Sequence, residues 1–183
     1  MHYPSNEPVT FSRDCDAIII PSGEEIRLSE GVSGFLTQAL GGSFSIYVEG
    51  NLFRIAGTDA DAIGKEAMAP PDVPTNATTK EIEAVIWEQL KTCYDPEIPI
   101  NVVDLGLIYS CEIQTTGSNE YLANVEMTLT AAGCGMGDIL MQDVKEKIEI
   151  IPTIREVKVE LVFDPPWNQS MMSETAQLEA GLL

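Results

Sequence analysis

Residues 127–138 read MTLTAAGCGMGD, and this stretch decides how the second half of the chain folds. A strand-like run ends at Thr130, a glycine-rich bend follows, and a helical pattern begins directly after the bend. The pattern predicts that Cys134 lies near the start of a helix, where backbone N–H groups and the helix dipole favour a thiolate over a thiol. The flanking Gly133 and Gly135 permit either a tight turn or the close approach of a ligand.

The segments around this stretch predict an α-β-β-α-β order for residues 79–183. Thr78 and Glu81 form a capping-box pattern ahead of a helix with one apolar face. Two alternating strands follow on either side of a Gly117-Ser118-Asn119 turn, then a second helix and a strand that stops at Asp164-Pro165. The pattern indicates an α+β fold with a three-stranded mixed sheet. Its first two strands should form an antiparallel hairpin, and its third should run parallel to the second.

The last strand is expected to place four apolar residues on one face: Val157, Val159, Leu161 and Phe163.

Residues 1–65 predict a small, mostly β module of about five short strands. The apolar run at 17–20 ends at Pro-Ser-Gly, and Glu49-Gly50-Asn51 separates two further apolar segments as a hairpin turn does. Residues 66–78 carry three prolines and no apolar periodicity, which is typical of a linker. The chain is therefore predicted to consist of a β module, a linker and an α/β domain at 79–183.

The composition limits the classes of function. With 29 acidic and 10 basic side chains, the formal net charge is −19, which argues against direct contact with nucleic acid or anionic lipid. The acidity favours solubility or a docking face for a basic partner. No apolar run approaches the roughly 20 residues that cross a bilayer. The N-terminal residues also lack the basic and apolar regions of an export signal, so a cytoplasmic protein is expected.

The four cysteines are scattered without a C-x-x-C pair, which is typical of reduced thiols in the cytoplasm. Cys93 and Cys111 fall on apolar faces and are expected to act as small buried hydrophobes. Cys15 lies between two aspartates, whose charge disfavours a thiolate, and is expected to be inert. The only histidine is His2, so a zinc site of the usual His/Cys type is not expected.

The predicted topology brings distant residues to one edge of the sheet. Asp104 precedes the first strand, Thr130 ends the second, and Asp164 and Trp167 follow the third. All four should therefore share a rim with the thiol, and Glu97 is a further candidate there. Asp104 would either orient a metal or a proton beside the thiol, or cap the turn before its strand. Trp167 is expected to cover the edge of the core.

Three ordered motifs resemble those of the iron–sulfur cluster assembly accessory family that includes SufT and PaaD. Residues 95–109 (DPEIPINVVDLGLIY) resemble its first signature and the Cys134 stretch its second. Residues 163–168 (FDPPWN) resemble the third signature in the form typical of SufT. The N-terminal module, with IPSG at 20–23 and TQALGG at 37–42, is similar to the extension that marks SufT.

The resemblance implies a cytoplasmic factor that helps to mature or deliver iron–sulfur clusters, with Cys134 and Asp104 as its central residues. Relatives often carry proline at the position of Ala132, and eukaryotic relatives place histidine at the position of Gly133. A histidine-assisted mechanism is therefore not expected in this chain.

One thiolate cannot hold a cluster alone, because clusters are usually bound by four protein ligands. No stably bound cofactor is therefore expected. A transient cluster or iron would need two subunits sharing Cys134, as in a homodimer, or ligands from the assembly machinery or a client apo-protein. The favoured function is thus an adaptor or transient carrier rather than an enzyme. Two alternatives stay open: a module that bridges assembly partners through its acidic surface, and a thiol enzyme that uses Cys134 as nucleophile with a base such as Asp104.

Overall fold

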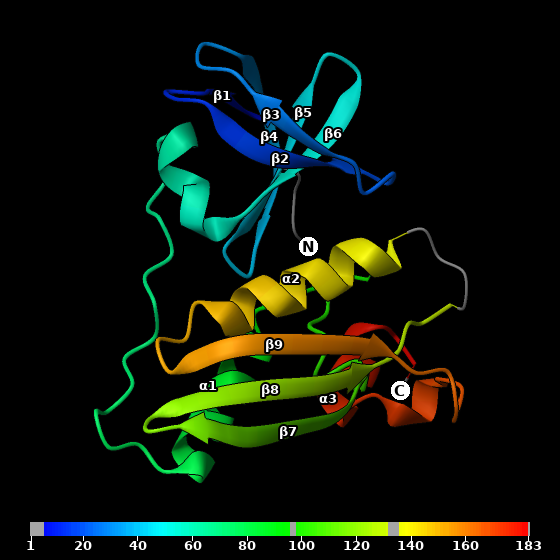
Figure 1. Cartoon of the computed structure of the whole chain (residues 1–183). Coiled ribbons are helices and arrows are strands. Elements are labelled where there is room, and N and C mark those ends of the chain that lie inside the picture. Colours follow the sequence, from blue (N-terminus) through cyan, green and yellow to red (C-terminus); the bar gives the residue numbers. More distant parts are fainter. Residues whose placement is uncertain (1–5, 96–97, 132–135, 183) are drawn as a thin grey trace. The chain divides into compact units, whose positions relative to one another are not determined.

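The structure is a computed structural model that describes residues 6–95, 98–131 and 136–182. It consists of two compact units, Met1–Ala69 and Pro70–Leu183 (Figure 1). The boundary falls inside the 66–78 segment that the sequence marks as a linker. One unit is an antiparallel sheet and the other a mixed sheet with helices, so the predicted α+β class is confirmed. Within the described residues, no helix is long and apolar enough to cross a membrane.

The N-terminal unit contains a six-stranded antiparallel sheet in the order β1-β4-β5-β6-β2-β3, one strand more than the sequence suggested. The predicted hairpin turn joins β5 to β6, where Glu49 and Gly50 both have positive φ angles, 46° and 91°. Two such residues are what a tight type I′ turn requires, and glycine adopts this conformation without steric cost. The elements are β1 (Glu7–Thr10), β2 (Cys15–Ile20), β3 (Glu25–Leu28), β4 (Ser33–Leu40), β5 (Ser43–Val48), β6 (Asn51–Ile55) and the 3-10 helix η1 (Gly57–Ile63).

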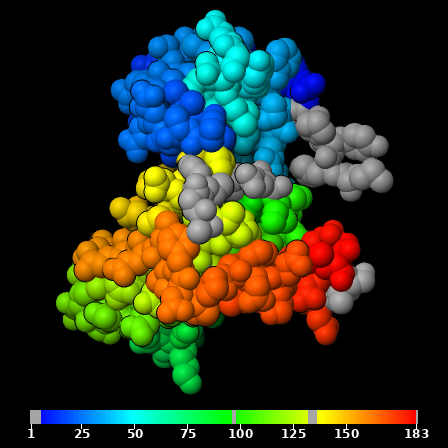
Figure 2. All heavy atoms as spheres, turned by 90° about the vertical axis from the view of Figure 1, so that its right-hand side faces the viewer, coloured from blue at the N-terminus to red at the C-terminus, as the bar shows by residue number. Residues whose placement is uncertain are grey.

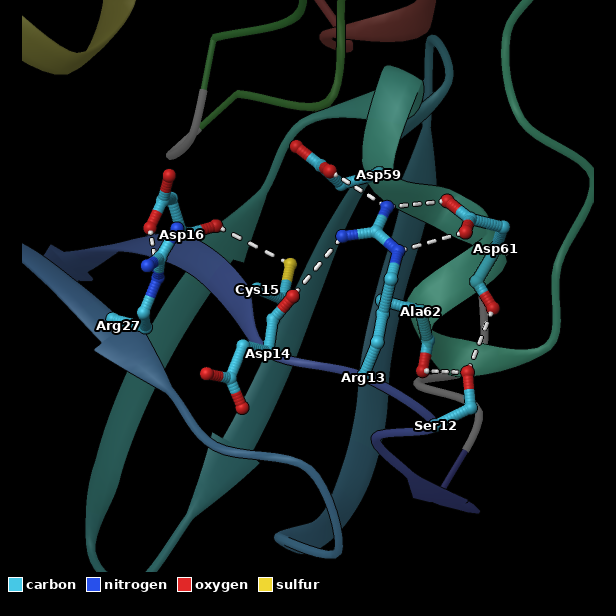
Figure 3. A network of polar contacts seen from close by, with 9 residues as sticks. All are labelled: Ser12, Arg13, Asp14, Cys15, Asp16, Arg27, Asp59, Asp61 and Ala62. Carbon is cyan, nitrogen blue, oxygen red and sulfur yellow. Dashed lines mark hydrogen bonds and ion pairs between the residues drawn. The ribbon is translucent and has the colours of Figure 1, made fainter.

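An ion-pair network fastens the segment before β2 to η1 (Figure 3). The Arg13 guanidinium donates to Asp59 at 2.8 Å and to Asp61 at 2.6 Å. The hydrogen bond from Arg13 to Asp61 holds the pKa of Asp61 below its usual range. Beside it, Cys15 is 1% exposed. Burial, reinforced by the charge of Asp59, raises the pKa of Cys15 to about 11. Cys15 is therefore a poor nucleophile, as expected, but the main cause is burial rather than the flanking aspartates.

The C-terminal unit has the predicted α-β-β-α-β order, with two short helices added at its end. Strand β7 pairs antiparallel with β8, and β8 pairs parallel with β9, which confirms the predicted topology. The elements are α1 (Thr79–Leu90), β7 (Ile108–Gly117), β8 (Glu120–Met127), α2 (Gly137–Glu149), β9 (Ile154–Leu161), η2 (Gln169–Met171) and α3 (Glu174–Glu179).

Helix α1 begins at the capping box that the sequence predicts. The Thr78 side chain accepts the N–H of Glu81, and the Glu81 carboxylate accepts the N–H of Thr78 at 2.7 Å. Helices α1 and α2 contact each other, and they contact β7 and β9 respectively, so both cover the same face of the sheet. The core between them is apolar throughout and includes Ile82, Ile86, Leu90, Cys93, Ala123, Val125, Met127, Val144 and Ile148.

Strand β9 is shorter than the sequence pattern suggests. Its last ladder bond joins the N–H of Val162 to the carbonyl of Met127, and the chain then leaves the sheet. Phe163, expected to continue the apolar face of Val157, Val159 and Leu161, lies beyond the strand and is 46% exposed. Its partner strand β8 ends at Met127, so the pairing stops before the last residue of the alternating pattern.

Candidate functional site

Three chain segments meet at the end of the sheet where β8 and β9 finish. The N–H of Thr128 donates to the carbonyl of Leu107 at 2.8 Å, and that of Val162 donates to the carbonyl of Met127 at 2.8 Å. The loop before β7 and the exits of β8 and β9 therefore lie side by side. This arrangement brings together the neighbourhoods of Asp104, Thr130 and Asp164, which the sequence analysis placed on one rim: 101–107, 128–131 and 162–167. Thr130 is half-buried and Asp164 is exposed.

The side chain of Asn101 shapes the loop before β7. Its Oδ1 accepts the N–H groups of Val103 at 3.1 Å and Asp104 at 2.9 Å. Its Nδ2 donates to Oδ2 of Asp104 at 2.6 Å, which fixes the orientation of that carboxylate. The sequence analysis left Asp104 as either an orienting or a capping residue. In the structure Asn101 caps the turn, and Asp104 is a half-buried carboxylate held by it.

The C-terminal segment 164–182, called here the C-terminal strap, packs against this loop. Nε1 of Trp167 donates to the carbonyl of Leu105 at 2.8 Å, and the N–H of Ser173 donates to the carbonyl of Asp104 at 2.8 Å. Figure 2 faces this end of the sheet and shows the strap, in orange and red, lying across it. Trp167 also packs against the core, as expected, so it joins the core edge to the backbone of the loop.

Further contacts fasten the strap to β7 and to the core. The hydroxyl of Tyr109 donates to the carbonyl of Pro165 at 2.6 Å. Met172 and Ala176 are 6% and 1% exposed and belong to the core of the unit. Gly106, with φ +70°, lies so close to the strap that a Cβ there would meet the Met171 carbonyl. The loop and the strap thus form one packed structure.

Sequence reasoning missed three residues of this rim: Asn101, Tyr109 and Ser173. An asparagine ahead of a bend is a recognised turn signal, so Asn101 was detectable. Ser173 caps α3 through the N–H of Ala176, which is also a readable pattern. No local sequence pattern predicts the hydrogen bond from Tyr109 to Pro165 of the strap, 56 positions away.

Four residues predicted for the site lie outside the described residues: Glu97, Gly133, Cys134 and Gly135. Their places on the rim stay predictions. On either side of the cysteine motif, the described chain ends at Ala131 and resumes at Met136.

The other three cysteines are buried or half-buried. Cys93 is fully buried, as expected. Cys111 is half-buried and packs against the core, and burial raises its pKa to about 11, with a smaller contribution from the charge of Glu83. Together with Cys15, these residues are unfavourable nucleophiles and metal ligands at neutral pH. Among the described residues, no group of three His, Cys, Asp or Glu side chains is placed to hold a metal ion.

Comparison with known proteins gives matches that include the C-terminal unit. Residues 83–161 match the family described as iron-sulfur cluster assembly protein. An "Fe-S protein maturation auxiliary factor" of Porphyromonas gingivalis is 46% identical over 103 residues, which are 56% of this chain and 94% of that protein. The Staphylococcus aureus protein named "Fe-S protein maturation auxiliary factor SufT" is 39% identical over 88 residues, 48% of this chain and 96% of that protein. A solved DUF59 domain from Bacillus anthracis is 30% identical, with a TM-score of 0.49, over 57% of this chain and 95% of that one.

Proposed function

Because the chain belongs to the iron–sulfur cluster assembly protein family, we propose that it is an auxiliary factor in the maturation of iron–sulfur proteins. Relatives that it matches over 94% and 96% of their length carry that name. In the finer form of the proposal, the protein is an adaptor or transient carrier that helps to deliver clusters to client apo-proteins through Cys134.

The observation that carries this proposal is the rim at the ends of β8 and β9. The Asp104 carboxylate is fixed there by Asn101, and the strap holds the loop through its backbone. Cys134 follows Thr130 in the sequence and precedes α2, whose N-terminal end favours a thiolate. A preformed rim of this kind would give a donor or client protein a defined surface to contact, since the loop before β7 and the strap are held by packing rather than by the cargo.

In this proposal each site residue has a distinct role. Cys134 would be the transient ligand of iron or of the cluster, and Asp104 would orient it. Gly133 and Gly135 would let the backbone approach the cargo closely. Thr130, Glu97, Asp164 and Trp167 would line the surface that meets the donor or the client.

A single thiolate leaves the ligand set of a cluster incomplete, because clusters usually take four protein ligands. The assembly machinery or the client would supply the other ligands, and the cluster would pass on by ligand exchange. The cluster would then be cargo that the protein hands on, and not a cofactor that it keeps. The relatives' names, which describe auxiliary factors, support a helper rather than a catalyst.

The direct test is anaerobic transfer of a cluster from a loaded scaffold protein to an apo client, followed by client absorption and activity. Cys134→Ser should slow client activation strongly while far-UV circular dichroism stays unchanged. The matched control is Cys111→Ser, whose thiol has a raised pKa and should be dispensable. Undiminished activation by Cys134→Ser would contradict the carrier role.

The acidity of the chain favours a second candidate, a module that bridges assembly partners without touching the cluster. The net charge of −19 suits a basic partner. In that case partner binding would survive Cys134→Ser but weaken as salt screens the charges. A covalent adduct on Cys134 that forms and turns over, detected by mass spectrometry, would instead indicate a thiol enzyme.

A further inference from the structure

Strand β9 forms an edge of the three-stranded sheet. In the described part of the C-terminal unit it pairs only with β8, and Figure 1 shows it as the outermost strand with α2 alongside. An edge strand leaves a row of backbone N–H and C=O groups that a further strand can pair with.

A groove of about 450 Å³ follows this edge. On β9 it is lined by residues of both strand faces, Val157 and Val159 from one and Lys158 and Glu160 from the other, so it follows the unpaired edge itself. On the helix side it is lined by a single face of α2 with Asp138, Met141, Gln142 and Lys145.

We propose that a second copy of this chain docks in the groove, with β9 pairing antiparallel to the partner's β9 about a two-fold axis at Val159. Such an isologous contact requires a surface that complements itself. With Val159 opposite its own copy, Lys158 lies opposite the partner's Glu160, and Val157 lies opposite the partner's Leu161. Each of these pairs occurs twice, so opposite charges meet on one face and apolar side chains meet on the other.

Neighbouring registers are less complementary. An axis at Lys158 places two lysines opposite each other and sets Glu156 against the partner's Glu160, and like charges directly opposite each other destabilise a strand pair. An axis at Val157 also pairs Glu156 with the partner's Lys158, but it sets Arg155 against the partner's apolar Val159 and Ile154 against the partner's Glu160. Charge therefore disfavours the axis at Lys158, and the matching of apolar side chains favours Val159 over Val157.

Helix α2 fits the same axis. A Cβ on Gly137 would lie 3.7 Å from Cδ1 of Leu161, so the helix start is level with the end of β9. Moving back along the strand from Leu161 to Val159 covers about 6.6 Å. The same distance along the helix is about four residues, which is the position of Met141. The groove residues Asp138 and Lys145 then lie on opposite sides of the axis, and each faces the other's copy.

The charged groups of this surface are free to rearrange. Asp138, Lys158 and Glu160 are exposed. The ion pairs within the chain are long and solvent-exposed, 3.7 Å for Lys145 with Glu149 and 3.6 Å for Lys158 with Glu156. Such pairs contribute little, so exchanging them for contacts with the partner costs little. The strand pairing supplies the attraction, and the charged and apolar pairs together specify the register.

The test is a charge-reversal cycle on the full-length chain, with the dimer dissociation constant measured by sedimentation equilibrium at constant salt. Lys158→Glu and Glu160→Lys each set like charges opposite each other, and each should weaken the dimer roughly tenfold. The double variant restores opposite charges and should regain the wild-type affinity, which also excludes unfolding as the cause. Glu112→Lys, the same charge change on the far edge strand β7, is the matched control and should have no effect.

Three outcomes would overturn the proposal. One is a chain that stays monomeric over the whole concentration range. Another is a dimer that ignores both single reversals, because its contact then lies elsewhere. The third is a double variant as weak as the single variants, because the two residues then do not face each other.

Discussion

Replacing Gly106 by alanine tests the link between the loop before β7 and the C-terminal strap. Gly106 has φ +70°, which costs an alanine about 1 kcal/mol. The new Cβ would also meet the Met171 carbonyl oxygen and lie 2.8 Å from the carbonyl carbon. Backbone on both sides leaves no flexible side chain to move aside, so the strap must shift.

The size of the effect follows from the contacts that a shifted strap loses. The bonds of Trp167 to Leu105 and of Ser173 to Asp104 contribute about 1 kcal/mol each. Part of the burial of Met172 is lost as well, about 1 kcal/mol of the roughly 2 kcal/mol for a full methionine side chain. With the conformational cost, Gly106→Ala should reduce the free energy of unfolding by about 4 kcal/mol.

Gly181→Ala is a matched control, because Gly181 has φ +72° and a Cβ added there would have nothing within 4 Å. It should cost only the conformational term, about 1 kcal/mol. Urea unfolding followed by tryptophan fluorescence measures both variants. The chain has 2 tryptophans, Trp87 and Trp167, so the signal reports on the C-terminal unit alone. Equal destabilisation by the two variants would refute the packing of strap on loop.

Three further predictions concern helix α1 and the thiols of Cys15 and Cys111. Thr78→Ala removes the N-cap and should cost about 1 kcal/mol in urea unfolding, whereas Thr79→Ala one residue later should be nearly neutral. Ile86→Ala leaves a cavity in the core and should cost about 3 kcal/mol, and Ile86→Val about 1 kcal/mol; a similar cost for both would contradict tight packing there. The pKa values of Cys15 and Cys111 are raised to about 11, so only a small fraction of either thiol is ionised at pH 8 to 9. The rate of their alkylation should therefore keep rising about tenfold per pH unit above pH 8. A plateau in this rate near pH 9 would contradict a pKa raised by burial.

Much of the C-terminal unit could be read from local sequence. The Thr78–Glu81 capping box and the alternating strands depend on residues close together in the chain. The parallel pairing of β9 with β8 follows from the handedness of a strand-helix-strand connection. The end of β9 was missed at Phe163, because the apolar alternation continues past the point where pairing stops. The N-terminal sheet was undercounted because its edge strands β1 and β3 are four residues each and carry little periodic signal.

The candidate site at the rim was also only partly predictable from the sequence. Its location followed from topology, and the Asp104 and Trp167 candidates lie in it. The roles of their neighbours could not be read, because Tyr109 and Ser173 act through contacts with residues far away in the sequence.

The sequence by itself determined the order of the elements, the acidic character and the three motifs that include Cys134, since each depends on neighbouring residues or on composition. The tertiary structure alone decided that Asn101 holds the Asp104 carboxylate in place and that the strap clamps the loop. It also decided that β9 and α2 leave a groove at the sheet edge. Contacts between distant segments depend on where packing places them, and no local pattern encodes that position.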